Sequence, residues 1–127
     1  MVDKCATIAA RAGLAVHFLH VSPGKAPVAK HVATGKFTRQ VDYHKIIISN
    51  ILQKAILRMR NSGIVAKFQV VSGPVARKIA EVARDIKADM LIMGCQTHNA
   101  LHHLVHGSVP AEVMKQLDLP VMLLPVS

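Results

Sequence analysis

Segments with helical periodicity alternate with short apolar segments along the whole chain, and this alternation limits the folds open to it. Helices are predicted where apolar residues recur every three to four positions, and strands where short apolar runs stop at glycine or proline. The predicted helices are residues 3–12, 42–62, 75–86 and 108–117, and the predicted strands are residues 14–21, 64–71, 90–93 and 121–126. This order is typical of an α/β protein with an open parallel sheet and helices on both faces, a flavodoxin-like three-layer sandwich.

The chain opens inside a predicted helix, whereas proteins of this class normally open with a strand. That first strand is usually central, between the second and fourth strands of the sheet. Without it, the strands over residues 14–21 and 90–93 are each left with unpaired main-chain N–H and C=O groups. We therefore expect the sheet to lack its N-terminal first strand and a natural segment to precede Met1.

Size and composition exclude several classes of protein. With 127 residues, 51% of them hydrophobic, the chain is long enough for a packed core and too apolar for a disordered segment. No linker or repeat divides it, so we predict one domain over residues 1–127. No apolar run approaches the roughly 18 residues of a membrane span, and the N-terminus lacks a signal-peptide pattern. Two isolated cysteines, Cys5 and Cys95, favour a reducing, cytoplasmic location without disulfides.

Positive charge is concentrated in the first half of the chain. The net charge is +9; residues 1–60 carry ten Lys or Arg against two acids, and residues 61–127 carry six against five. This excess favours an anionic partner, a nucleotide or a nucleic acid, or is simply a solvated basic surface. Residues 22–41 hold four of the basic residues and no acid, together with two prolines and two glycines. We expect this segment to be a loop that is mobile until a ligand binds.

The C-terminal part holds a glycine-containing pattern between two predicted elements. The apolar run over residues 90–93 stops at Gly94, a polar loop follows, and Gly107-Ser108 opens the predicted helix. Glycine lets a ligand approach the main chain closely, and N–H groups at a helix N-terminus attract anions. Ser108 can cap the helix and also donate to a phosphate. The pattern indicates a phosphate-binding loop, although a glycine at a strand end and a serine at a helix start also occur without a ligand.

These residues resemble the nucleotide loop of the universal stress protein family. Gly94, Thr97 and Gly107-Ser108 follow the spacing G-x-x-G-x9-G-[ST], with Thr97 in place of the second glycine. The Ile-Met-Gly strand end, the final Leu-Pro-Val-Met-Leu-Leu-Pro run and the segment His17 to Val21 are similar to the same family. The resemblance covers nearly the whole chain and implies an adenine-nucleotide α-hydrolase-like fold. The family's first strand, which carries an aspartate near the adenine and ribose, has no counterpart here.

The resemblance also implies a site for ATP or a related adenine nucleotide, with Mg²⁺ as an optional companion. The positions that match the family's site are Val21, Met93, Gly94, Gln96, Thr97, Gly107, Ser108 and Val109. In this comparison Val21 offers main-chain contacts to the adenine, while the Gly107 and Ser108 amides hold the phosphates. The side chain of Thr97 restricts its main chain and can crowd a phosphate, and some family members bind no ATP. The sequence therefore leaves two alternatives: a functional nucleotide site, and a site that binds no nucleotide.

The polar loop contains a cluster of histidines, and the sequence contains no catalytic motif. His98, His102, His103 and His106 lie within nine residues, and His98, His102 and His106 would share one face of a helix at a spacing that suits a transition metal. Contact with phosphate and a solvated loop are the other interpretations, and we predict no metal site. No Ser-His-Asp set, carboxylate pair or dinucleotide glycine motif is present, so we predict no enzyme beyond slow ATP hydrolysis.

The sequence as a whole predicts a small ATP-binding sensor or regulator of the stress response. The alternative is an interaction module of the same fold that binds no nucleotide and uses its basic surface to bind an acidic protein or nucleic acid, of which nucleic acid is the less expected. A homodimer is also predicted, because residues 120–126 are apolar and would form an exposed sheet edge. Pairing this strand with its copy about a two-fold axis would cover the edge, as family members commonly do.

Overall fold

The computed structural model describes residues 1–22, 36–96 and 109–126 of the chain. The elements in chain order are α1 (Val2–Ala12), β1 (Val16–Ser22), α2 (Lys36–Asn61), β2 (Ala66–Ser72), α3 (Val75–Asp85), β3 (Leu91–Gln96), α5 (Val109–Gln116) and β4 (Val121–Val126). Helices and strands alternate as the sequence predicts.

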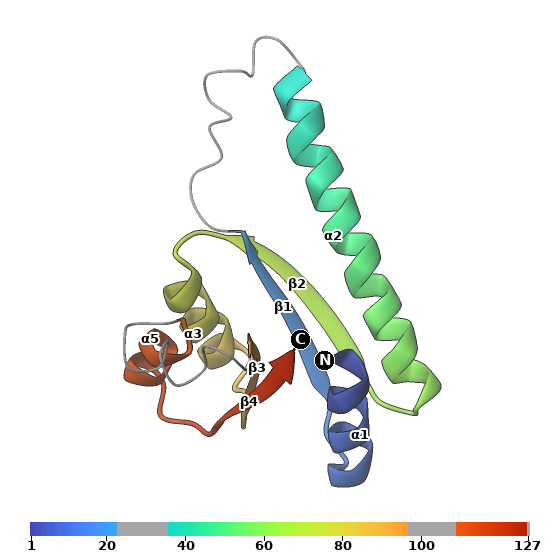
Figure 1. Cartoon of the computed structure of the whole chain (residues 1–127), viewed down its shortest axis with the longest axis vertical. Coiled ribbons are helices and arrows are strands. Elements are labelled where there is room, and N and C mark those ends of the chain that lie inside the picture. The colour runs from blue at the N-terminus through green and yellow to red at the C-terminus, as the bar shows by residue number, and fades with distance from the viewer. Residues whose placement is uncertain (23–35, 97–108, 127) are drawn as a thin grey trace.

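The helices form two layers with the strands between them. Helices α1 and α2 lie on one side of the strands and pack against each other, and α3 and α5 do the same on the other side (Figure 1). Arg58 of α2 donates from Nε to Asp3 Oδ1 of α1 over 2.9 Å, and Arg84 of α3 donates to the Gln116 carbonyl at the end of α5. The predicted α/β class, with parallel strands and helices on both faces, is confirmed.

The four strands form two separate parallel pairs. Strand β1 pairs with β2, with Val16 opposite Ala66 and Ser22 opposite Ser72. Strand β3 pairs with β4, with Leu91 opposite Val121 and Gln96 opposite Val126. No ladder joins β1 to β3 within the described residues. These are the two strands whose facing edges we expected to carry no ladder.

One apolar cluster joins both strand pairs to the first helical layer. Its buried members are Cys5, Ala6, Ala9, Ile56, Met59, Ile64, Ala66 and Leu124, and its partly buried members are Val2, Ile8, Val16, Phe18, Phe68, Ile92 and Met122. The cluster takes residues from all four strands, so α1 and α2 hold the two pairs against one apolar layer. Because burial of apolar area is the main stabilising term in folding, this layer stabilises the divided sheet.

Glycines end two elements as the sequence predicts. Gly13 follows α1 in the left-handed conformation, at φ 68°, and its N–H donates to the Ala9 carbonyl. Gly73, at φ 138°, forms the turn between β2 and α3. Both conformations favour glycine because they crowd a Cβ atom against the main chain.

Two predicted boundaries are wrong. Helix α2 begins at Lys36, so residues 36–41 are helical, although we assigned them to a loop; the rest of that loop, residues 23–35, lies outside the described residues. The six residues from Lys36 to Val41 contain no glycine or proline, and the helix simply continues back through them. Strand β3 does not stop at Gly94 but continues to Gln96, because ladder pairing with β4 carries it through the glycine.

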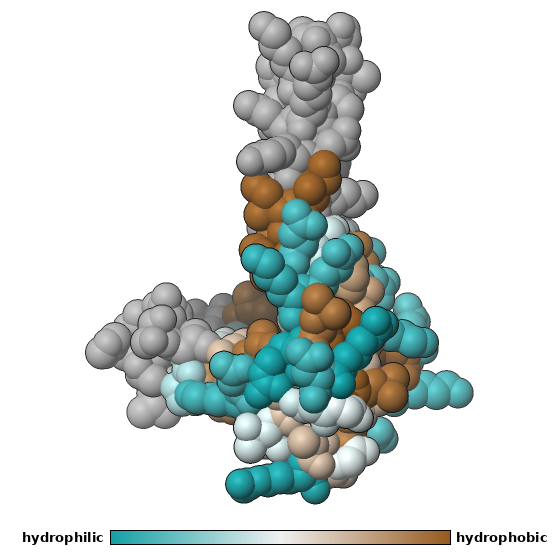
Figure 2. All heavy atoms as spheres, turned by 90° about the vertical axis from the view of Figure 1, so that its right-hand side faces the viewer, coloured by the Kyte–Doolittle hydropathy of each residue, from teal (hydrophilic) through white to brown (hydrophobic). Residues whose placement is uncertain are grey.

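Helix α2 exposes apolar side chains beyond the body of the molecule. Ile46 is 55% exposed and Ile51 is 56% exposed, and Figure 2 shows apolar side chains gathered on this part of the helix. The buried side chains of α2, Ala55, Ile56 and Met59, lie nearer its C-terminal end. Only that end of the helix is therefore anchored by core packing among the residues whose side chains are described.

Candidate functional site

Five of the eight predicted nucleotide contacts lie at the carboxyl ends of β1 and β3 and at the start of α5. Val21 is next to last in β1 and half-buried, and Val109 is the first residue of α5. Met93, Gly94 and Gln96 occupy the second half of β3. Thr97, Gly107 and Ser108 lie outside the described residues. The structure therefore places part of the candidate site and brings Met93, Gly94 and Gln96 together on one strand.

The main chain of Val21 is not used in pairing with β2. Val16 N–H donates to the Val65 carbonyl over 2.9 Å, and Gly73 N–H donates to the Ser22 carbonyl over 3.0 Å. Successive residues of a strand present their main-chain groups to opposite edges, so even-numbered residues of β1 face β2. The odd-numbered residues, His17, Leu19 and Val21, face the other edge, which we call the free edge of β1.

The main chain of Gly94 is likewise not used in pairing with β4. Leu91 N–H donates to the Pro120 carbonyl over 2.9 Å, so the odd-numbered residues of β3 face β4. Ile92, Gly94 and Gln96 present their main-chain groups to the opposite edge, the free edge of β3. Met93, by contrast, uses its main chain in the ladder with β4. Of the predicted contacts on β3, Gly94 and Gln96 are the ones with main-chain groups left for a ligand.

The conformation of Gly94 does not require a glycine. Gly94 is not among the glycines with positive φ, it lies inside a regular ladder opposite Leu124, and it is exposed. Glycine weakens a strand interior and often marks a place where a ligand or another main chain approaches closely. Gly94 is exposed and carries no side chain, so its main chain is accessible.

The thiol of Cys5 is a packing group. Its side chain is buried against α2 and the strands, and burial raises the pKa of the Cys5 thiol, an effect that the nearby N-terminal ammonium opposes. A raised pKa keeps the thiol neutral and unreactive in the folded protein. No disulfide forms at Cys5. The sequence-based interpretations of Cys95 and of the histidines between 98 and 106 concern side chains outside the described part of the chain.

This burial predicts that alkaline pH destabilises the fold through Cys5. Because the folded pKa lies above the ordinary value of 9.0, the stabilisation is complete below that value and is lost as the pH rises through the folded pKa. We expect the midpoint of urea unfolding to fall more steeply across this range in the wild type than in Cys5→Ala. Equal slopes for the two proteins would contradict the prediction.

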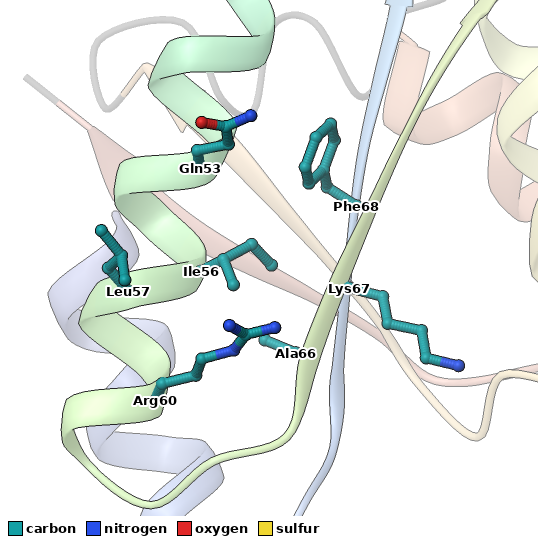
Figure 3. Close-up of a pocket in the computed structure, with 7 residues that line it drawn as sticks. All are labelled: Gln53, Ile56, Leu57, Arg60, Ala66, Lys67 and Phe68. Carbon is teal, nitrogen blue, oxygen red and sulfur yellow. The ribbon is translucent and has the colours of Figure 1, made fainter.

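A hollow between α2 and β2 was not predicted. It measures about 530 Å³ and is lined by Gln53, Ile56, Leu57, Arg60, Ala66, Lys67 and Phe68. Arg60 extends from α2 toward β2, whereas Lys67 points away on the other side of the strand (Figure 3). Alternation of Ala66 and Phe68 on β2 is visible in the sequence, but the hollow depends on how α2 packs there. It contains none of the predicted nucleotide contacts.

Other kinds of site are not supported by the described residues. They contain no group of three or more His, Cys, Asp or Glu side chains placed to hold a metal ion. Among the helices that the structure describes, none is long and apolar enough to cross a membrane. The ion pairs within α3 and α5, such as Lys78 Nζ with Glu81 Oε2 at 3.1 Å, join neighbouring turns of one helix. Pairs of this kind add little stability and form no catalytic arrangement.

The fold defines an α/β protein of the doubly wound parallel class, and the candidate site lies at the carboxyl ends of its strands. The chain belongs to the universal stress protein family, whose family model matches residues 1–125. It is 26% identical over 107 residues to universal stress protein G of Shigella flexneri, which covers 84% of this chain and 75% of the relative. The predicted family is confirmed.

Solved structures of the same family share the fold. A universal stress protein from Burkholderia pseudomallei matches with a TM-score of 0.72 and 20% identity, covering 98% of this chain and 84% of the other. A universal stress protein in complex with cAMP matches with 0.66 and 23%, covering 99% and 85%. One from Archaeoglobus fulgidus in complex with dAMP matches with 0.65 and 19%, covering 96% and 82%.

Proposed function

We propose that this chain is a cytoplasmic, non-catalytic regulator of the stress response that binds ATP or a related adenine nucleotide. Its nucleotide site lies at the carboxyl ends of β1 and β3 and at the N-terminus of α5. Membership of the universal stress protein family supports the stress-response role. The cAMP and dAMP complexes of two structural neighbours support an adenine nucleotide as the ligand.

The observation that carries the proposal is the position of the predicted contacts at the carboxyl ends of β1 and β3. Helices α1 and α2 lie on one face and α3 and α5 on the other, so the chain changes direction between β1 and β3. In open α/β sheets, ligands bind at this switch point, outside the carboxyl ends of the strands. Val21 and Gly94 lie toward the carboxyl ends of β1 and β3, and their main-chain groups are unused by the ladders.

Replacing Gly94 tests the site while sparing the fold. Gly94→Val introduces a residue that strands favour at an extended position, so the α/β fold should be kept. The new side chain should block approach to the main chain and weaken ATP binding about tenfold or more, measured by isothermal titration. Ile92→Val, on the same free edge two residues earlier, is the matched control and should bind as the wild type does.

A substitution at Gly107 tests the predicted phosphate-binding loop. A bulky β-branched residue there should abolish nucleotide binding without unfolding the protein, because it would stand among the phosphate-binding amides. Wild-type affinity in both Gly94→Val and Gly107→Val would remove the nucleotide site from this end of the strands.

The purified protein alone can distinguish the alternative function, an interaction module that binds no nucleotide. The chain contains no Trp and one Tyr, so it absorbs weakly at 280 nm and a co-purified nucleotide would dominate the ratio of absorbance at 260 to 280 nm. A protein that carries no nucleotide and shows no heat of binding with ATP, cAMP or AMP would favour the module, whose partner would then be an acidic protein or a nucleic acid.

A further inference from the structure

The hollow between α2 and β2 has an apolar floor that is open to solvent. Ile56 of α2 and Ala66 of β2 are buried, and Phe68 is half-buried beside them. Leu57, which also lines the hollow, is 57% exposed. The volume of about 530 Å³ falls within the range of about 300–1,000 Å³ that is usual for small-molecule sites. The hollow is therefore large enough for a ligand whose apolar part covers this floor.

Arg60 is a positive charge directed into the hollow. Its side chain extends from the last turn of α2 toward Ala66 on β2 (Figure 3). The ion pairs between described side chains all join other residues, so no described carboxylate neutralises Arg60. Lys67, the other cation of the lining, points away on the far side of β2, and the lining contains no acid. The hollow thus presents one guanidinium group that no described acid pairs with.

The carbonyls at the end of α2 do not oppose this charge. Carbonyls at a helix C-terminus carry partial negative charge and would repel an anion. Here the Met59 carbonyl accepts from Ser62 N–H and Ile64 N–H, each over 3.0 Å. The Arg60 carbonyl accepts from Gly63 N–H over 2.9 Å. These carbonyls are used in the turn to β2, which leaves the guanidinium to determine the charge at this end of the hollow.

Gln53 marks the other end of the hollow. It lies seven residues before Arg60 on the same face of α2, and its side chain points toward Phe68 (Figure 3). Seven residues rise by about 10 Å along a helix, a length that an extended chain of roughly eight to ten carbons matches. Ile56 and Leu57 lie on α2 between the two polar residues. The helix wall of the hollow is therefore polar at its ends and apolar along its middle.

We propose that the hollow between α2 and β2 is a second binding site, which holds a medium-chain carboxylic acid. The carboxylate pairs with Arg60 through two parallel N–H···O hydrogen bonds, the geometry that a guanidinium favours. The aliphatic chain runs along α2 toward Gln53 and covers Ile56 and Phe68. One guanidinium matches the single charge of a carboxylate, whereas a phosphate monoester carries closer to two charges at neutral pH.

Titration with decanoate, followed by NMR, tests the proposal. The whole chain is used, with the side-chain methyl groups of Ile56 and Leu57 and the guanidinium of Arg60 as reporters. We expect saturable shifts at all three groups. Decanol has the same chain and no charge, and it should bind about tenfold or more weakly, because it loses the charge-assisted hydrogen bonds.

Two variants separate the head group of the ligand from its chain. Arg60→Gln changes an exposed side chain, so the fold should be kept; decanoate affinity should fall about tenfold or more, and decanol affinity should stay the same. Leu57→Ala shortens the apolar wall and should weaken both ligands by a similar factor, about threefold to tenfold. Lys54→Gln is the matched control: it removes the same charge from the same helix outside the hollow and should bind decanoate as the wild type does.

Four results would overturn the proposal. An absence of saturable shifts at the methyl groups of the hollow in millimolar decanoate would show that no acid binds there. Equal affinity for decanoate and decanol, or for the wild type and Arg60→Gln, would show that Arg60 recognises no carboxylate. Equal losses for Arg60→Gln and Lys54→Gln would show attraction to the basic surface alone. The hollow contains none of the predicted nucleotide contacts, so these results do not depend on whether ATP binds.

Discussion

Replacing Met59 by alanine is expected to lower the free energy of unfolding by about 2–5 kcal/mol, the range found for large-to-small changes in packed cores. Met59 is fully buried, at 0% exposure, in the cluster that joins α1, α2 and the strands. Truncation would leave a cavity where two helices and both strand pairs meet.

The main chain of Met59 also holds the turn that follows α2. Its carbonyl accepts hydrogen bonds from Ser62 N–H and Ile64 N–H, each over 3.0 Å, and these bonds close the turn from α2 into β2. Alanine keeps both bonds, so the loss measured is that of the side chain alone. This makes the substitution a test of core packing and not of the turn.

Leu57→Ala is the matched control on the same helix. Leu57 is 57% exposed, and its truncation removes little buried area. We expect a change of at most about 0.5 kcal/mol, as for ordinary surface substitutions. Urea unfolding followed by circular dichroism measures both variants, and similar losses for the two would mean that the cluster around Met59 is not the core.

The elements that sequence reasoning placed well are those with local stop signals. The strand over residues 121–126 was predicted with its observed bounds, since Pro120 stands before it and apolar residues fill it. The end of α1 was fixed by Gly13, whose left-handed conformation the sequence anticipated. The lack of a ladder between β1 and β3 among the described residues was expected from topology, because these two strands are not neighbours in a doubly wound order.

The boundaries that were wrong depend on tertiary pairing or on the absence of a stop signal. Nothing in the residues marks Gly94 as a strand interior; its place in β3 follows from pairing with Leu124. The first turn of α2 holds no acidic residue, so this signal for a helix start is missing at Lys36. For the site, the glycine and serine spacing identified the family, but the alternation that leaves Val21 and Gly94 unpaired could be read only from the ladders.

The outer edge of β4 predicts how the protein assembles. Pro120 presents its carbonyl to β3, so Val121, Leu123 and Pro125 present their main-chain groups to the opposite edge. That edge has no strand partner among the described residues, and Lys4 Nζ donates to the Pro125 carbonyl over 3.2 Å. Pro125 has no N–H, which leaves Val121 and Leu123 as the donors for a ladder.

We expect two chains to pair through this edge, antiparallel about a two-fold axis, and Leu123→Lys to separate them. Two copies of the same short ladder satisfy each other, and the apolar side chains of Val121 and Leu123 lose water on pairing. Lysine at Leu123 would place like charges opposite each other across the axis, a device that proteins use to keep edges apart.

Leu123→Val keeps an apolar, strand-favouring residue and should remain dimeric. Sedimentation should give twice the mass of one 13.8-kDa chain for the wild type and for Leu123→Val, and one chain for Leu123→Lys. A wild-type mass of one chain at micromolar concentrations would show that the edge of β4 stays unpaired, and the short ladder limited by Pro125 would then be too small to hold two copies together.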